Sequence, residues 1–443
     1  MAKLKLKEKM SYGLGDAANN LTFSMVSTYL LIFYTDVFGI TAAAVGTLFL
    51  VARIFDAFTD PMMGALIDRY GKNGENGRFR PYLKWAGFPL VILAVLLFTT
   101  PDLSDSGKLA YAYVTYILFG MAYTAVNIPY GSLASVMTRD PVERSSLASF
   151  RGLGQQVGMF VVGVLIVPMI ALFPSQQIGY PVVIAIIGVL ALIFYYLAYR
   201  NTKERIQPNK SVKPEKMSWK MISRTLKNGP FMALSLMSFF ILSAMLLNQA
   251  VALYFFTYNL ENEMLFPVYN MINIASLFVI IPLIPTFTKR FGKKNVTLCG
   301  FLIGFIAFGG LFLLPTTPVI VIFLLWLGMQ GIMIPNILVW AFISDVIDYG
   351  EWKTGVRQEG TTYSLYSFMR KLSQAIAGWG AAMGLALIGY VPNVAQSPET
   401  LFGFKIIMAL LPAIACVICF IIFKYGYLLD DEKFKKISAD LSA

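Results

Sequence analysis

The chain is a succession of long apolar runs separated by short polar segments. Twelve of these runs are long enough to cross a bilayer, which takes about 20 apolar residues in a helix. Six lie in the first half of the chain, at 12–34, 41–67, 82–100, 110–137, 147–173 and 178–199. Six lie in the second half, at 230–258, 264–287, 296–314, 319–347, 361–389 and 401–423. The pattern therefore predicts an all-α membrane protein with twelve transmembrane helices.

A polar stretch between the sixth and seventh runs predicts two domains. We expect an N-terminal six-helix bundle over 1–200, a linker over 201–228, a C-terminal six-helix bundle over 229–427 and a tail over 428–443. A short motif supports an internal repeat. The second run is followed by DRYGK at 68–72 and the eighth by KRFGK at 289–293, 221 positions later in a chain of 443 residues. Two pseudo-symmetric halves of this kind occur in transporters built from parallel repeats.

Composition and charge agree with a membrane location. Hydrophobic residues make up 57% of the chain and charged residues only 14%, against roughly 25% charged residues in soluble domains. The net charge of +12 does not indicate nucleic acid as a partner, because 30 of the 36 Lys and Arg residues lie at the termini, in the linker and in alternate loops. Cytoplasmic loops retain positive charge. We therefore expect a multi-pass protein of the cell membrane with both termini in the cytoplasm.

Several motifs are absent, and their absence limits the chemistry. Cys416 and Cys419 have the spacing of a metal or redox pair, but the chain has no histidine and no second such pair, so we interpret them as packing residues. No phosphate-binding loop of an ATPase is present, so uphill transport must use an ion gradient. We expect no cofactor, and a coupling ion that is H⁺ or Na⁺.

The second run carries charges that the bilayer disfavours. A charge at the centre of a spanning helix costs about 2.5–3.5 kcal/mol, and Arg53, Asp56 and Asp60 are spaced so that they share one helix face. An Arg53–Asp56 ion pair would neutralise only one of the two aspartates and leave the other carboxylate without a counter-ion. Two carboxylates, the hydroxyl of Thr59 and a backbone carbonyl freed by the following Pro61 are hard oxygen ligands, suited to Na⁺ or to proton exchange.

The first and fourth runs contain further polar side chains. Asn20 lies one turn beyond Asp16, and the fourth run contains Tyr123, Thr124 and Asn127. Amides and tyrosines hydrogen-bond sugar hydroxyls, and aromatic rings stack on the C–H faces of sugars. Hydrogen bonding between helices is an equally common role for a single Asn, so binding and packing both remain open here. For Arg370 we favour snorkelling to the cytoplasmic interface.

Three motifs resemble those of a known transporter family. They are RIFDAFTDP at 53–61, NIPY at 127–130 and DYGE at 348–351, with supporting stretches at 34–39, 77–82 and 362–371. The sequence resembles the glycoside-pentoside-hexuronide:cation symporters, a family of the major facilitator superfamily that includes the melibiose permeases. The resemblance implies two pseudo-symmetric six-helix bundles and symport of a small-molecule glycoside with H⁺ or Na⁺ by alternating access. We expect a monomer in the lipid bilayer.

The resemblance also implies particular site residues. The cation site falls on Asp56, Asp60 and Thr124, with Thr59 where melibiose permeases have Asn, and the two aspartates would be the metal ligands if the ion is Na⁺. The sugar contacts fall on Asn19, Asn20, Tyr123, Asn127, Arg151 and Lys371.

The substrate expectation follows from charge. Melibiose permeases have Asp where this chain has Asn20 and Asn127, which disfavours an α-galactoside. A cavity without those carboxylates that keeps Arg151 and Lys371 favours an anionic sugar. The stretches at 131–134 and 370–378 look most like the β-glucuronide branch, with the xyloside branch close behind. We therefore favour a β-glucuronide or other hexuronide.

Three alternatives remain open. If Lys371 pairs with Asp16, Asp56 or Asp60, the cavity is neutral and a pentoside such as a xyloside is the substrate. A passive sugar uniporter would have the same fold. A remote alternative is an intramembrane aspartyl protease, because GLGD at 13–16 fits the pattern of those enzymes. Their partner Tyr-Asp pair is absent from the chain, so we expect a transporter and no enzyme.

Overall fold

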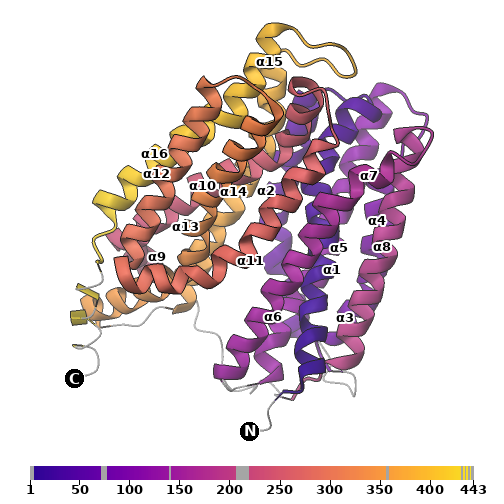
Figure 1. The fold of residues 1–443 in the computed structure, drawn as a ribbon. Helices are drawn as coiled ribbons and strands as arrows, with labels where there is room; N and C mark the ends of the chain where they lie inside the picture. The colour runs from indigo at the N-terminus through magenta and orange to yellow at the C-terminus, as the bar shows by residue number, and fades with distance from the viewer. Residues whose placement is uncertain are drawn as a thin grey trace. The chain divides into compact units, whose positions relative to one another are not determined.

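The computed structural model describes residues 4–70, 77–138, 141–205, 219–355, 359–430, 433–434, 436–437 and 440. These residues form a succession of helices with no β-strand among them (Figure 1). They group into two compact units. Unit 1 is Met1–Lys213 with Phe266–Met271 and Val391–Val394, and unit 2 is Pro214–Leu265, Ile272–Tyr390 and Ala395–Ala443.

The apolar runs of the first half are helical over most of their length. The helices are α1 (Leu6–Ile32), α2 (Ala42–Tyr70), α3 (Arg80–Trp85), α4 (Gly87–Leu97), α5 (Asp105–Met137), α6 (Pro141–Phe160), α7 (Ile166–Ile170) and α8 (Gln176–Asn201). The π-helical segments Phe33–Val37 and Val161–Leu165 extend α1 and join α6 to α7. The third run is split between α3 and α4, and the fifth between α6 and α7.

The runs of the second half are helical as well. The helices are α9 (Trp219–Leu226), α10 (Gly229–Tyr254), α11 (Leu265–Phe291), α12 (Lys293–Leu313), α13 (Pro318–Thr354), α14 (Glu359–Leu387), α15 (Pro398–Lys405) and α16 (Leu411–Ile421). The π-helical segments Phe255–Asn259, Ile406–Leu410 and Ile422–Gly426 follow α10, α15 and α16. The short helix α9 falls within the predicted linker, whose residues 206–218 lie outside the described residues.

Eight helical segments in the described part of the chain are long and apolar enough to cross a membrane. They comprise α3 with α4, α5, α6 with α7, α8, α10, α12, α13, and α15 with α16. In α1, α2 and α14 the predicted runs hold more polar and charged residues, and those helices supply the polar clusters described below. The protein is a multi-pass membrane protein.

The two units repeat one packing pattern. In unit 1, α1 packs against α6 and α8, and α4 packs against α5 and α8. In unit 2, α10 packs against α14 and α16, and α12 packs against α13 and α16. In both six-helix series the first helix therefore contacts the fifth and sixth, and the third contacts the fourth and sixth. The repeated motif in the sequence thus corresponds to a repeated arrangement of helices.

Glycines allow the closest helix contacts in unit 1. A Cβ atom added at Gly154 of α6 would lie 1.9 Å from the carbonyl oxygen of Gly13, and one at Gly158 would lie 2.8 Å from that of Ala17. A Cβ at Gly13 would lie 2.4 Å from the carbonyl oxygen of Phe150. Small residues let helices approach in this way in membranes. The backbones of α1 and α6 are therefore in direct contact along their polar faces.

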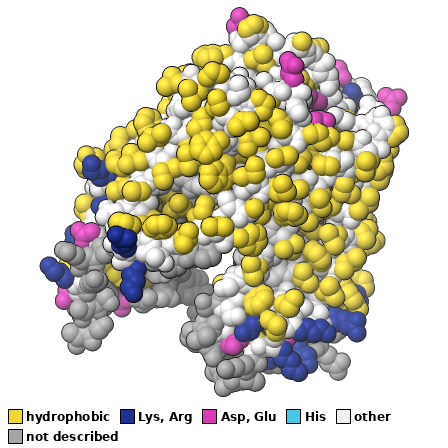
Figure 2. Space-filling view, in the orientation of Figure 1, with side chains coloured by type: hydrophobic (Ala, Val, Ile, Leu, Met, Phe, Trp, Pro, Cys, Tyr) yellow, Lys and Arg dark blue, Asp and Glu magenta, His cyan; other side chains and the backbone are white. Residues whose placement is uncertain are grey.

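Charge is unevenly distributed over unit 1. Figure 2 shows hydrophobic side chains covering its visible face, with Lys and Arg gathered at the end where α3 lies. There the Glu204 carboxylate accepts hydrogen bonds from the backbone N–H groups of Arg78, Phe79 and Arg80 at 2.8–2.9 Å. Arg80 Nε in turn donates to the carbonyl of Tyr199 at 3.0 Å. These hydrogen bonds join the start of α3 to the end of α8 and to the residues that follow it.

Candidate functional site

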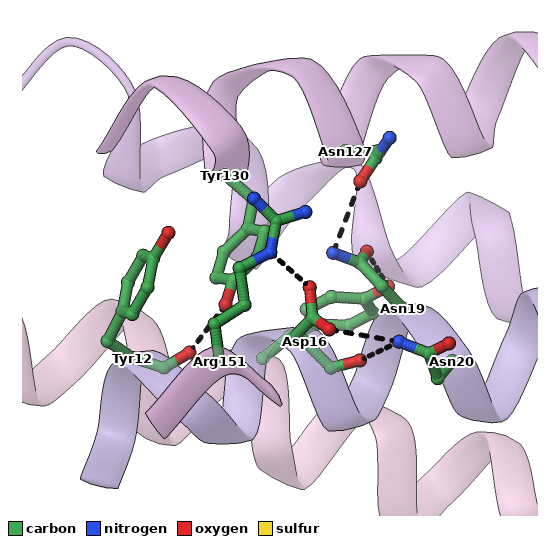
Figure 3. A network of polar contacts seen from close by, with 8 residues as sticks. Tyr12, Asp16, Asn19, Asn20, Asn127, Tyr130 and Arg151 are labelled. Carbon is green, nitrogen blue, oxygen red and sulfur yellow. Dashed lines mark hydrogen bonds and ion pairs between the residues drawn. The ribbon is translucent and has the colours of Figure 1, made fainter. Parts of the chain in front are cut away.

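A buried ion pair joins the two closest helices of unit 1. Asp16 of α1 is 5% exposed, and Arg151 Nε of α6 lies 2.9 Å from its Oδ1. The Asn20 amide, one helical turn further along α1, donates to Asp16 Oδ2 at 3.0 Å and to the Asp16 carbonyl at 2.9 Å (Figure 3). Both carboxylate oxygens of Asp16 therefore have hydrogen-bond donors, as a buried charge requires.

A chain of amides continues from this pair. The hydroxyl of Tyr195 on α8 donates to Asn19 Oδ1 at 2.8 Å. Asn19 Nδ2 donates to Asn127 Oδ1 on α5 at 3.5 Å, and Figure 3 shows the Asn127 amide oxygen directed at Asn19. The structure thus brings together the predicted sugar contacts Asn19, Asn20, Asn127 and Arg151.

Two tyrosine rings support the arginine. The rings of Tyr12 and Tyr130 stack with centroids 4.9 Å apart, and the Arg151 guanidinium lies 5.4 Å from the Tyr130 ring centre. A Cβ atom at Gly15 would lie 2.5 Å from the Tyr130 ring. The glycines of the GLGD motif thus make room for α6 and Tyr130, and its Asp16 is held in an ion pair. The motif has a structural explanation without protease chemistry.

The charge of Arg151 is balanced, which corrects one step of the sequence argument. That step treated Arg151 as a positive charge facing the sugar with no counter-ion, whereas it is paired with Asp16. The pair uses only Nε, and the Arg151 side chain is 44% exposed where that of Asp16 is 7% exposed. In Figure 3 the two terminal nitrogens point away from the Asp16 carboxylate.

The predicted Arg53–Asp56 ion pair is present on α2. Arg53 Nη1 lies 3.1 Å from Asp56 Oδ2, and Thr59 Oγ1 donates to the Asp56 carbonyl at 3.4 Å. The side chain of Asp60 lies outside the described residues, although its backbone belongs to α2. Within the described part of the chain, no three His, Cys, Asp or Glu side chains gather where they could hold a metal ion.

The Asp56 carboxylate packs on α5, the helix that carries the other predicted cation ligand. A Cβ atom at Gly120 would lie 2.8 Å from Asp56 Oδ1. Thr124 is one turn beyond Gly120 and is 6% exposed, so both share the face of α5 turned toward α2. The contact brings Asp56 to the helix face on which Thr124 lies.

One aromatic residue that the sequence analysis did not single out contacts both a predicted sugar-binding residue and the arginine that pairs with Asp56. Phe23 of α1 lies one turn beyond Asn20, and its ring centroid is 5.5 Å from that of Tyr123. The Arg53 guanidinium lies 5.7 Å from the same Phe23 ring. Phe23 therefore contacts one residue of the predicted sugar group and the counter-ion of Asp56. No pattern in the sequence distinguishes it from an ordinary packing residue.

The remaining predicted contact lies in unit 2. Lys371 of α14 is exposed. Its neighbour Arg370 lies over the Trp340 ring at 5.6 Å, and its Nη1 donates to the hydroxyl of Tyr366 at 3.5 Å. Arg370 is thus held by aromatic side chains of its own unit.

The fold and this site define a class of protein. Two units of packed helices, with charged and amide side chains on the apolar helices α1, α2, α5 and α6, are features of a membrane transporter of the major facilitator type. Residues 11–431 match the family of MFS/sugar transport proteins. The chain belongs to this family and, within it, to the glycoside-pentoside-hexuronide:cation symporter group, as its motifs indicate.

Three relatives are similar over most of their length. An uncharacterized symporter of Bacillus subtilis, YjmB, is 42% identical over 99% of this chain and 96% of its own. A glucuronide carrier protein homolog of Escherichia coli is 35% identical over 99% and 96%. An isoprimeverose transporter of Lactiplantibacillus pentosus is 37% identical over 89% and 83%. The chain is therefore a sugar-transporter relative and not an enzyme, and the protease alternative is wrong.

Proposed function

We propose that the protein is a cation-coupled symporter that carries a β-glucuronide or another hexuronide across the cell membrane by alternating access. The observation that carries this proposal is the way in which the Arg151 side chain is held. Its Nε is held by the buried Asp16, while its terminal nitrogens face away from that carboxylate. A planar guanidinium held in this way matches a sugar carboxylate in two parallel hydrogen bonds.

The amides around Arg151 suit the rest of a sugar. The Asn20 amide oxygen can accept a hydrogen bond from a sugar hydroxyl, and the Asn127 amide nitrogen can donate one. Tyr123 supplies an aromatic face on which the C–H side of a sugar ring can stack. We propose that Asn19, Asn20, Tyr123, Asn127 and Arg151 bind the glycoside.

We propose Lys371 of α14 as a further sugar contact. It is an exposed cation on α14, and it could pair with the anionic group of the sugar. Its contribution should therefore be largest for a hexuronide and small for a neutral glycoside.

We propose that Asp56 and Asp60, with Thr59 and Thr124, bind the coupling ion. The position of Asp56 against α5 supports this role, because it brings a carboxylate to the helix face of Thr124. Arg53 offsets the negative charge of Asp56, and we propose that Asp60 contributes the carboxylate that takes up H⁺ or Na⁺. Phe23, in contact with both Arg53 and Tyr123, provides a physical link between ion and sugar.

A pentoside symporter is the second candidate. The name of the isoprimeverose transporter, 37% identical to this chain, favours a sugar of that class. The balanced Asp16–Arg151 pair also removes one argument against a neutral substrate.

Counterflow in proteoliposomes tests the proposal. The purified protein is reconstituted, and labelled β-glucuronides and β-xylosides compete while external pH and Na⁺ are varied independently. We expect glucuronide uptake that one of the two cation gradients drives and that an ionophore abolishes. Displacement by neutral β-xylosides without displacement by β-glucuronides would select the pentoside candidate. Uptake that equilibrates but never concentrates the sugar would select a uniporter.

A further inference from the structure

Unit 2 contains a cavity that neither the sugar nor the cation proposal uses. Its volume is about 190 Å³, and it lies where α9, the start of α10 and the end of α13 meet. Three cationic side chains line it, Arg224, Lys227 and Lys353, and the described residues that line it include no carboxylate. Arg224 and Lys227 come from α9 and the turn after it, and Lys353 comes from the last turns of α13.

A capping residue fixes the geometry of this cavity. Asn228 begins α10: its Oδ1 accepts the backbone N–H of Phe231 at 3.2 Å, and its Nδ2 donates to the Val346 carbonyl of α13 at 3.3 Å. At Gly350 a Cβ atom would come within 3.4 Å of Asn228 Nδ2. The turn that carries Lys227 is therefore tied to the helix that carries Lys353. The backbone positions that carry Lys227 and Lys353 are therefore held near one another by this contact.

The lining identifies the ligand chemistry. Three like charges around one cavity repel one another, and an anion with several acceptor oxygens would relieve that repulsion. Val346 and Ile347 add apolar surface to the same cavity, which suits an ester better than a small inorganic ion. Basic pockets between transmembrane helices recognise phosphate headgroups on such grounds.

We propose that this cavity binds a phosphoryl group, carried either by an anionic phospholipid headgroup or by a soluble phosphate ester. None of the residues that line it is among the proposed sugar contacts, so its occupancy needs no transported substrate. Because α9 is followed directly by α10, a bound phosphoryl group would hold α9 and the start of α10 against α13 and α14.

Thermal denaturation of the full-length protein in detergent tests the proposal. The Tm is followed while one of four probes is titrated: short-chain phosphatidylglycerol, short-chain phosphatidylcholine, glycerol phosphate or inorganic phosphate. The cavity variant is Arg224→Gln, Lys227→Gln and Lys353→Gln combined. Its matched control removes three exposed cations of unit 2 that do not line the cavity, Lys289→Gln, Arg290→Gln and Lys424→Gln.

We expect phosphatidylglycerol to raise the Tm of the wild type and of the control variant with similar apparent Kd. Each cavity cation removed should weaken binding about fivefold. If the triple variant does not fold, the single variant Lys353→Gln replaces it, and its affinity for phosphatidylglycerol should fall by the amount expected for one cation. If the cavity variant loses affinity for phosphatidylglycerol and glycerol phosphate does not bind, the ligand is a lipid headgroup. If glycerol phosphate binds equally well and the cavity variant loses that binding too, the ligand is a soluble ester. Equal losses in the cavity and control variants, or a wild type that none of the probes stabilises, would overturn the proposal.

Discussion

The Asp16–Arg151 pair yields the sharpest prediction, because its two partners should affect substrate preference in opposite directions. Arg151→Gln removes the guanidinium proposed to hold the sugar carboxylate. Asp16→Asn keeps the guanidinium and removes its internal counter-ion. The first variant should lower the preference for a β-glucuronide over the β-glucoside of the same aglycone, and the second should raise it.

The magnitudes follow from the contacts. A hydrogen bond to a charged group contributes about 1.5–3 kcal/mol, and a neutral one about 0.5–1.5 kcal/mol. Arg151→Gln should therefore cost the glucuronide about 1–2 kcal/mol more than the glucoside, which is about a tenfold change in relative Kd. Asp16 is 7% exposed in its side chain, so Arg151→Gln also leaves a buried charge without its partner and should lower the Tm.

The double variant Asp16→Asn with Arg151→Gln separates the two effects. It leaves no unpaired charge, so its Tm should recover relative to Arg151→Gln, while its preference for the glucuronide stays low. Isothermal titration calorimetry on the purified protein gives the Kd of both sugars, and circular dichroism gives the Tm. A Kd ratio for the two sugars that is the same in the wild type, Arg151→Gln and the double variant would refute the role of Arg151. The charge balance of the pair would then be structural only.

Three further predictions follow from the contacts. Asp56→Asn should abolish cation-driven uptake in proteoliposomes yet retain sugar binding, since it removes an ion ligand and not a sugar contact; wild-type accumulation in that variant would contradict the cation assignment. Asn127→Ala should weaken sugar binding by about 1–3 kcal/mol with little change in cation affinity, and an unchanged sugar Kd would leave it a packing residue. Gly154→Ala should lower the Tm markedly, because its Cβ would lie 1.9 Å from the Gly13 carbonyl, whereas Gly152→Ala, with nothing within 4 Å of its Cβ, should not; equal Tm values would show that α1 and α6 can move apart at no cost.

The helices could be predicted from the sequence because burial in lipid forces every backbone polar group to be satisfied within its own segment. An apolar run of sufficient length therefore has one outcome, and the predicted runs are helical over most of their length. The splits between α3 and α4 and between α6 and α7 were not predicted. They depend on local backbone geometry that hydropathy does not record. The repeat was visible because two loops after equivalent helices keep the same short motif.

The site could be predicted only in part, for a physical reason. A charge within a spanning helix is conspicuous, so Asp16, Arg53 and Asp56 are easily found, and the Arg53–Asp56 pair follows from helical spacing. The partner of Asp16 lies 135 positions away on α6. Such a pairing depends on which helices touch, which in turn depends on Gly13 and Gly154, and hydropathy does not order the helices in space. Tyr195 and Phe23 were missed because a tyrosine or phenylalanine in an apolar run looks like packing.

The charges of the proposed sugar and cation sites give a physical reason for the symport of an anionic sugar with a cation. In unit 1, Asp16 balances Arg151 and Asp56 balances Arg53, and the sequence places a further carboxylate, Asp60, in the predicted cation site. A cation at Asp60 would neutralise α2, and a hexuronate at Arg151 would add one negative charge beside amides in place of carboxylates. Had positions 20 and 127 been Asp, as in melibiose permeases, the same sugar would meet two like charges and be repelled. Restoring a carboxylate by Asn20→Asp should therefore depress the affinity for a glucuronide far more than that for a neutral glycoside, and equal losses for both sugars would show that Asn20 acts through shape alone.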